Sequence, residues 1–132
     1  MMVTPLYAGL LVFWFLVLSV RVIRRRGSDK IALGDGGNAR MLRVIRAQAN
    51  FAEYVPLALL LMALLELSRF SIYLLHGLGV TLLVARLLHG YALSFTPKFM
   101  FGRVAGTGLT FLMLAVAAVS CVYQALLAAR LW

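Results

Sequence analysis

One short stretch of the sequence carries several polar side chains at helical spacing. These residues are Arg43, Arg46, Asn50 and Glu53, separated by three, four and three positions. This spacing places them on one face of an α-helix. Arginines and an amide beside a single carboxylate suit a small anion that also carries an ammonium group. The stripe therefore indicates a site for a charged small molecule, with a purely structural polar network as the alternative.

A second pair of residues could belong to the same site. Arg86 and His89 are three positions apart and so share a helix face. Because His89 has no second His or Cys at metal-ligand spacing, we expect no metal site. Together with the stripe they form a cationic cluster that faces one carboxylate, Glu53. Its basic members are Arg21, Arg43, Arg46, Arg86, Lys98 and Arg103. An anionic lipid headgroup would satisfy these cations as well as a free anion.

The elements that must position these residues are membrane helices. Hydrophobic residues make up 64% of the 132 residues and charged residues 13%, which excludes an ordinary soluble domain and a disordered chain. A span needs about 20 mostly apolar residues, so the chain has room for about four. We predict a single-domain, all-α membrane protein over residues 1–132: a four-transmembrane-helix bundle with antiparallel up-down topology. The expected helices cover residues 4–26, 39–67, 71–93 and 104–129.

The segments between the spans carry their own signals. Residues 34–37 read GDGG, a composition typical of turns that need positive φ angles. Asn38 is expected to cap the helix that follows. Gly102 and Gly106 are four positions apart, a spacing that permits close contact between membrane helices.

The charge of the chain indicates its orientation. Thirteen Lys and Arg against four Asp and Glu give a net charge of +9. In a soluble protein this excess would favour nucleic acid, but the apolar spans make nucleic acid an unsuitable partner. Ten basic residues lie around the first and third loops and two on the opposite side. The positive-inside rule therefore places both basic loops in the cytoplasm and both termini outside.

The second predicted helix also carries a motif. Residues 46–56 read RAQANFAEYVP. This stretch resembles the R-x-Q-x-N-x-x-E-x-x-P motif of the MAPEG family, the membrane-associated proteins in eicosanoid and glutathione metabolism. The stretch ARLLH at residues 85–89, the chain length and the four-span layout are similar to the family too. The GDGG loop resembles that of small bacterial members.

The resemblance implies a homotrimer in the bacterial inner membrane, with glutathione bound between subunits near the cytoplasmic face. It implies a glutathione transferase or peroxidase, in which the glutathione thiolate attacks a lipophilic electrophile dissolved among the membrane lipids. Glutathione would be the only cofactor, used as substrate. By the family pattern, Arg103 would be the catalytic residue that stabilises the thiolate. The residues implied to bind or support glutathione are Arg21, Arg46, Gln48, Asn50, Glu53, Tyr54, Arg86, His89 and Lys98.

Two alternatives stay open. Many family members carry a Tyr four positions after the third-helix His, where this chain has Leu93. A non-catalytic, MAPEG-like scaffold or lipid-binding membrane protein is therefore the first alternative. The second is a small four-span drug/proton exporter. Such an exporter usually needs a carboxylate in its first span, which has none here, and the arginines around Glu53 would keep that carboxylate ionised.

Overall fold

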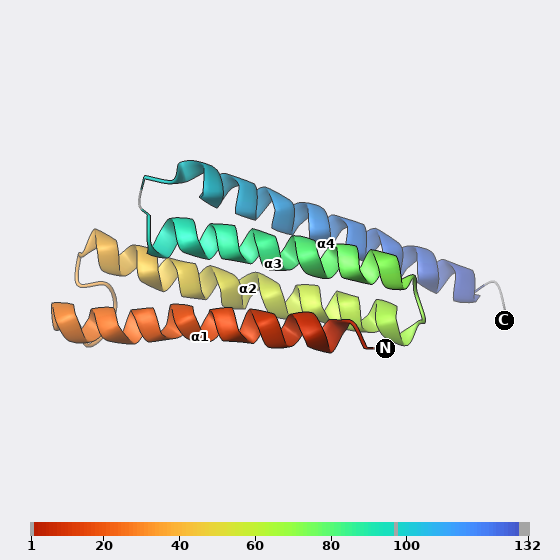
Figure 1. Ribbon diagram of the computed structural model, residues 1–132, viewed down its shortest axis with the longest axis horizontal. Helices are drawn as coiled ribbons and strands as arrows, with labels where there is room; N and C mark the ends of the chain where they lie inside the picture. Colours follow the sequence, from red (N-terminus) through yellow and green to blue (C-terminus); the bar gives the residue numbers. More distant parts are fainter. Residues whose placement is uncertain (1, 97, 130–132) are drawn as a thin grey trace.

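Four long α-helices form the part of the protein that the structure describes. The computed structural model describes residues 2–96 and 98–129. Its helices are α1 (Thr4–Asp29), α2 (Ala39–Leu67), α3 (Ile72–Ser94) and α4 (Met100–Ala129). Each is long and apolar enough to cross a membrane. Successive helices run in opposite directions, and the bundle is elongated along their axes (Figure 1). The expected all-α bundle of four apolar helices is confirmed.

Several helix ends differ from the expected positions. α1 continues three residues past the predicted end, to Asp29, because arginine is a good helix former and Arg25 pairs with Asp29 across 2.8 Å. α4 begins at Met100 instead of residue 104. Arg103 therefore lies inside the first turn of α4. α3 is displaced by one residue at each end.

The first loop holds the ends of α1 and α2 together. Its three glycines within residues 34–37 have φ angles between 59° and 71°, a region in which glycine avoids a clash of the Cβ atom. As predicted, Asn38 caps α2: its Oδ1 accepts hydrogen bonds from the N–H groups of Arg40 and Met41, at 2.9 and 3.2 Å. Its Nδ2 donates to the carboxylate of Asp29 at 2.9 Å. The loop therefore keeps the basic residues of α1 and α2 close together.

The core runs along the middle of the bundle, and α4 contributes least to it. Fully buried side chains from all four helices, including Leu11, Met62, Leu82 and Met113, form this core. Within the described residues, α4 contacts α2 and α3 but not α1. At the end of the bundle where the chain begins, α4 also extends past the first turn of α3 (Figure 1). Much of its apolar surface is left uncovered.

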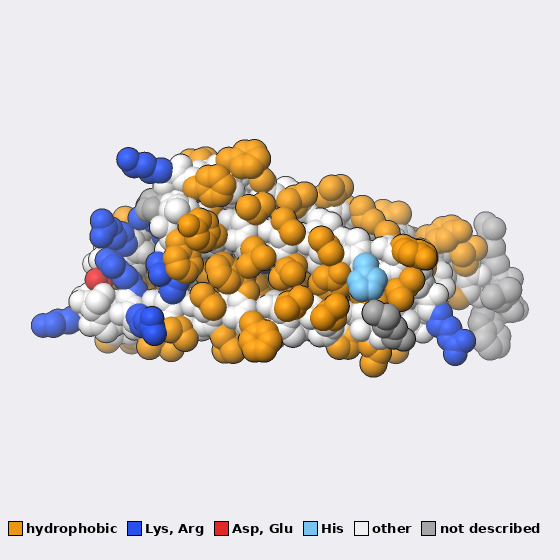
Figure 2. Space-filling model, viewed as in Figure 1, with side chains coloured by type: hydrophobic (Ala, Val, Ile, Leu, Met, Phe, Trp, Pro, Cys, Tyr) orange, Lys and Arg blue, Asp and Glu red, His pale blue; other side chains and the backbone are white. Residues whose placement is uncertain are grey.

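The charged side chains are concentrated at one end. Apolar side chains cover the middle of the face in Figure 2, and most Lys and Arg side chains visible there lie at its left end. We call this the basic end; it comprises residues 21–46 and 94–103, around the α1–α2 and α3–α4 connections. The long apolar middle matches the requirement of a hydrocarbon environment.

Candidate functional site

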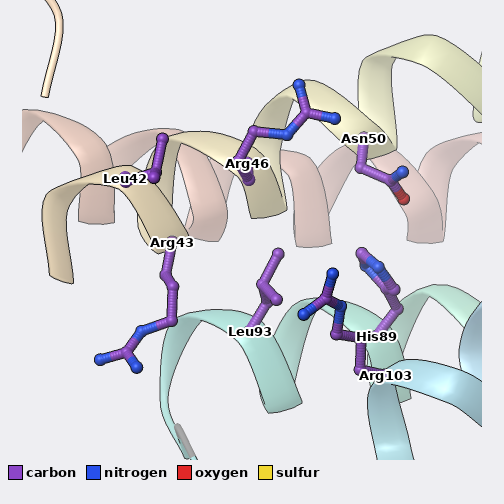
Figure 3. A pocket seen from close by; sticks show the side chains of 7 residues that line it. All are labelled: Leu42, Arg43, Arg46, Asn50, His89, Leu93 and Arg103. Atoms are coloured by element: carbon purple, nitrogen blue, oxygen red, sulfur yellow. The ribbon is translucent and has the colours of Figure 1, made fainter. Parts of the chain in front are cut away.

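A pocket of about 230 Å³ opens near the basic end, between α2, α3 and α4. Its lining residues are Leu42, Arg43, Arg46, Asn50, His89, Leu93 and Arg103, and Figure 3 shows them on their three helices. The guanidinium groups of Arg43 and Arg46 extend from α2 in opposite directions (Figure 3). Three cationic side chains, an amide and an imidazole line this pocket, which are the groups that an anion site requires.

Glu53 forms an ion pair at the edge of this pocket. Its Oε1 lies 3.7 Å from Nη1 of Arg46, and the two side chains are 50% and 55% exposed. An exposed pair at this distance contributes little to stability. A ligand can therefore replace this ion pair: an anionic group would bind Arg46 in place of Glu53, and an ammonium group would bind Glu53 in place of Arg46.

Arg86 lies behind the pocket instead of on its wall. Its side chain is buried, with 2% exposed. Nη1 donates to Oδ1 of Asn50 at 2.8 Å, and Nη2 donates to Oγ1 of Thr110 at 2.5 Å and to the carbonyl oxygen of Gly106 at 3.3 Å. Within the described residues its Nε has no hydrogen-bond partner. Arg86 thus fastens α2, α3 and α4 together and supports Asn50 from behind.

His89 and Arg103 are brought together by close packing of α3 on α4. His89 is 5% exposed and lines the pocket. A Cβ atom at Gly106 would lie 2.7 Å from the Cβ atom of His89 and 2.6 Å from the carbonyl oxygen of Ala85. Only glycine fits at this distance, as the Gly102–Gly106 spacing predicts. The close approach places Arg103, one turn before Gly106, beside His89.

Arg21 does not reach this pocket in its own chain. Its Nε and Nη2 donate to the hydroxyl and the carbonyl oxygen of Ser94, both at 2.8 Å. Its guanidinium carbon lies 3.6 Å from the centroid of the Phe95 ring. Arg21 therefore binds the end of α3 and lines a neighbouring cavity.

Three further residues implied by the resemblance lie away from the pocket lining. Gln48 donates through Nε2 to the hydroxyl of Ser19 at 3.3 Å, between α2 and α1. The ring of Tyr54 packs against Phe111 of α4, with centroids 5.6 Å apart. Lys98 is exposed in the α3–α4 connection. One chain thus brings together Arg46, Asn50, His89 and Arg103 around the pocket, with Glu53 at its edge.

Sequence reasoning missed the acceptors that hold Arg86. Thr110 and the carbonyl group of Gly106 serve this purpose. Gly102, Gly106 and Thr110 are each four positions apart, so all three share one helix face. A hydroxyl on the same face as two helix-contact glycines was the available signal.

The comparisons with known proteins agree with this architecture. A model of the MAPEG family matches residues 4–123, which include parts of all four helices. The chain belongs to the MAPEG family. The membership confirms the family predicted from residues 46–56.

Curated relatives cover about two thirds of the chain. The inner membrane protein YecN of Escherichia coli strain K12 is 37% identical over 90 residues, which are 68% of this chain and 69% of that protein. The protein of the same name in Escherichia coli O6:H1 has the same identity and coverage. Four apolar helices and the family match together identify this MAPEG chain as an integral membrane protein.

Proposed function

We propose that this MAPEG protein binds glutathione in the pocket between α2, α3 and α4 and acts as a glutathione transferase or peroxidase in the inner membrane. The observation that carries the proposal is that Arg46, Asn50, His89 and Arg103, from three helices, line one pocket, with Glu53 paired to Arg46 at its edge. An inner membrane location is supported by YecN, which carries that description.

The charges of the pocket complement those of glutathione. The tripeptide carries two carboxylates and one ammonium group. Arg43 and Arg46 would receive the carboxylates, since guanidinium groups form charge-assisted hydrogen bonds with them. Glu53 would receive the ammonium group, and the amide nitrogen of Asn50 would donate to a peptide carbonyl group.

Arg103 is the group best placed to activate the thiol. A free thiol has a pKa of about 8.5, and a neighbouring cation lowers it by stabilising the thiolate. With the proton released to solvent, the thiolate sulfur would form a bond to the electrophilic atom as the leaving group departs. With a peroxide, the thiolate sulfur would instead bond to one peroxide oxygen as the O–O bond breaks and the other oxygen leaves as an alcohol. A second glutathione would then reduce the resulting sulfenic acid, giving glutathione disulfide and water. Neither step requires a metal or a covalent enzyme intermediate.

A homotrimer would complete the site. On α2, an exposed apolar stripe continues from Arg46 and Glu53 through Leu57, Leu60 and Leu64, at the three- and four-residue spacing of a helix contact face. A neighbouring subunit covering this stripe would close the open side of the pocket. The basic residues that lie outside the pocket of one chain, Arg21 and Lys98, would then serve a neighbour's pocket. By the positive-inside rule we place the basic end in the cytoplasm and both termini outside.

The proposal is tested by titrating the purified protein with glutathione while thiolate absorbance is followed. We expect a saturable thiolate signal that is lost in Arg46→Ala and Glu53→Ala. Arg69→Ala is the matched control, because Arg69 lies beyond the opposite end of α2 and its replacement also removes one positive charge. No binding at millimolar glutathione, or binding unchanged in both pocket variants, would overturn the proposal.

A second candidate is glutathione binding without turnover. The observation that favours it is Leu93, which lines the pocket at the position where many family members carry a Tyr. This candidate requires an intact oligomer that binds glutathione but conjugates no standard electrophile. A gain of conjugation in Leu93→Tyr would show that the missing hydroxyl is the cause.

A further inference from the structure

A second cavity lies beside the proposed glutathione pocket, and arginines make up half of its lining residues. It has a volume of about 310 Å³ and lies between the end of α1, the beginning of α2 and the end of α3. Its lining residues are Arg21, Arg25, Arg40, Arg43, Val44, Leu93, Ser94 and Phe95. Four guanidinium groups therefore surround an apolar wall.

The arginines of this cavity exceed the anionic groups around them. Asp29 is the carboxylate beside them, and it is already engaged by Nε of Arg25 at 2.8 Å and by Nδ2 of Asn38 at 2.9 Å. Within residues 2–96 and 98–129, the guanidinium groups of Arg40 and Arg43 make no hydrogen bond or ion pair. Two cations are thus free to bind an anionic ligand.

The cavity lies where a membrane places its headgroups. Arg21 directly follows the uncharged segment 5–20 of α1. The rings of Trp14, Phe95 and Tyr91 stack beside it, with centroids 6.2 Å apart for the first two and 5.4 Å for the last two. Tyr and Trp are enriched at membrane–water interfaces. The arginines therefore sit at the boundary, with hydrocarbon on one side.

An apolar surface leads from the cavity towards the hydrocarbon. Val17 precedes Arg21 by four positions on α1, and Leu87 and Tyr91 precede Phe95 by eight and four positions on α3. Residues four apart share a helix face, and Val17, Leu87 and Tyr91 are all exposed. A ligand in this cavity would thus meet cations at its head and apolar side chains along its tail.

We propose that this cavity binds the phosphate group of an anionic phospholipid. Arg40 donates to the phosphate oxygens, Arg21, Arg25 and Arg43 contribute positive potential, and an acyl chain follows the exposed faces of α1 and α3. A free soluble anion would use the arginines but would leave the apolar surface uncovered. Arg43 and Leu93 line both cavities, whereas Arg25 and Arg40 line this cavity and not the glutathione pocket. The proposal thus assigns a ligand to Arg25 and Arg40.

The test is native mass spectrometry of the full chain, released from micelles with equal amounts of phosphatidylglycerol and phosphatidylcholine. We expect phosphatidylglycerol to be retained preferentially. Arg25→Gln/Arg40→Gln should lower this preference about tenfold or more, since each basic residue near an anionic surface contributes appreciably to its attraction. Neither residue lines the glutathione pocket. If the double variant does not fold, Arg40→Gln alone, an exposed position in the first turn of α2, provides the measurement.

The matched control is Lys30→Gln/Lys98→Gln, which removes the same charge from exposed positions at the same end but outside the cavity. This control should keep the preference for phosphatidylglycerol. Equal retention of the two lipids would overturn the proposal, as would an equal loss of preference in the control. Binding of inorganic phosphate with the same arginine dependence, without a preference for phosphatidylglycerol, would assign the cavity to a soluble anion. That result would overturn the proposal that the cavity binds a phospholipid.

Discussion

Nη1 of Arg86 donates a hydrogen bond to Oδ1 of Asn50 at 2.8 Å, and this contact determines which half of the Asn50 amide is available to a ligand. The oxygen is occupied from behind, so Nδ2, with its two N–H donors, remains for the pocket. Because Arg86 is also held by Thr110 and Gly106 of α4, the orientation of Asn50 depends on three helices. The ligand atom that Asn50 meets must accordingly be an acceptor, such as a peptide carbonyl oxygen.

Replacing Asn50 by Asp separates support of Arg86 from ligand binding. Asn50→Asp keeps an acceptor for Arg86 and removes the donor that faces the pocket. We expect thermal stability to be maintained and glutathione affinity to fall about tenfold, because a hydrogen bond of this kind contributes roughly 1.5 kcal/mol. Calorimetric titration and thermal unfolding measure the two effects. Asn50→Ala should lose both stability and affinity, and wild-type affinity in Asn50→Asp would contradict the assignment.

Thr110 should matter for stability through Arg86. Thr110→Val preserves the shape of the side chain but removes the oxygen that accepts from Nη2 of Arg86, leaving a buried charged donor without that partner. Such a loss costs about 1–3 kcal/mol. We expect a lower unfolding temperature in detergent, measured by circular dichroism. Thr110→Ser retains the hydroxyl and is the control; equal unfolding temperatures for the Val and Ser variants would show that the hydroxyl is unimportant.

The packing of α3 on α4 predicts opposite effects for two neighbouring glycines. A Cβ atom at Gly106 would lie 2.6 Å from the backbone oxygen of Ala85, whereas one at Gly108 meets nothing within 4 Å. Gly106→Ala should therefore force α4 from α3, at a cost of about 1–3 kcal/mol. Gly108→Ala should be neutral or stabilising, because alanine is the better helix former. Equal effects on the unfolding temperature would contradict the close approach.

The sequence predicted the parts of the site that lie on one helix. Arg46, Asn50 and Glu53 share a face because their spacing matches the helical repeat, and that relation needs no tertiary information. The meeting of His89 with Arg103 requires the contact between α3 and α4. The family resemblance predicted that His89 and Arg103 share one site, but helical periodicity alone could not predict it.

Other features depend on contacts that no local pattern encodes. Arg21 was expected beside glutathione, but in its own chain it binds Ser94, 73 positions later, so its partner could not be read from spacing. α4 begins four residues before its predicted start, since no polar cap between Lys98 and Arg103 marks that boundary in the sequence. The position of Arg86 behind Asn50 reflects the need of a buried guanidinium for acceptors, which α4 supplies.

Removing the charge of Arg103 should shift the pH dependence of thiolate formation. If Arg103 stabilises the thiolate, it lowers the pKa of the bound thiol below the value of about 8.5 for a free thiol. The bound thiolate would then persist to lower pH in the wild type. In Arg103→Ala the midpoint should move upward, so that thiolate and conjugation are reduced at neutral pH and recover as the pH is raised. Thiolate absorbance of the glutathione complex across a pH series measures the shift.

The conservative variant distinguishes charge from packing. Arg103→Lys retains a cation in the first turn of α4. This variant should keep most of the decrease in the pKa of the bound thiol, although lysine lacks the two-pronged geometry of arginine. Arg69→Ala controls for a general loss of positive charge, since it lies beyond the opposite end of α2. A midpoint that does not move in Arg103→Ala, with glutathione still bound, would remove Arg103 from the catalytic role. The thiolate would then have to be stabilised by Arg46 or Arg43, the other two guanidinium groups of the pocket.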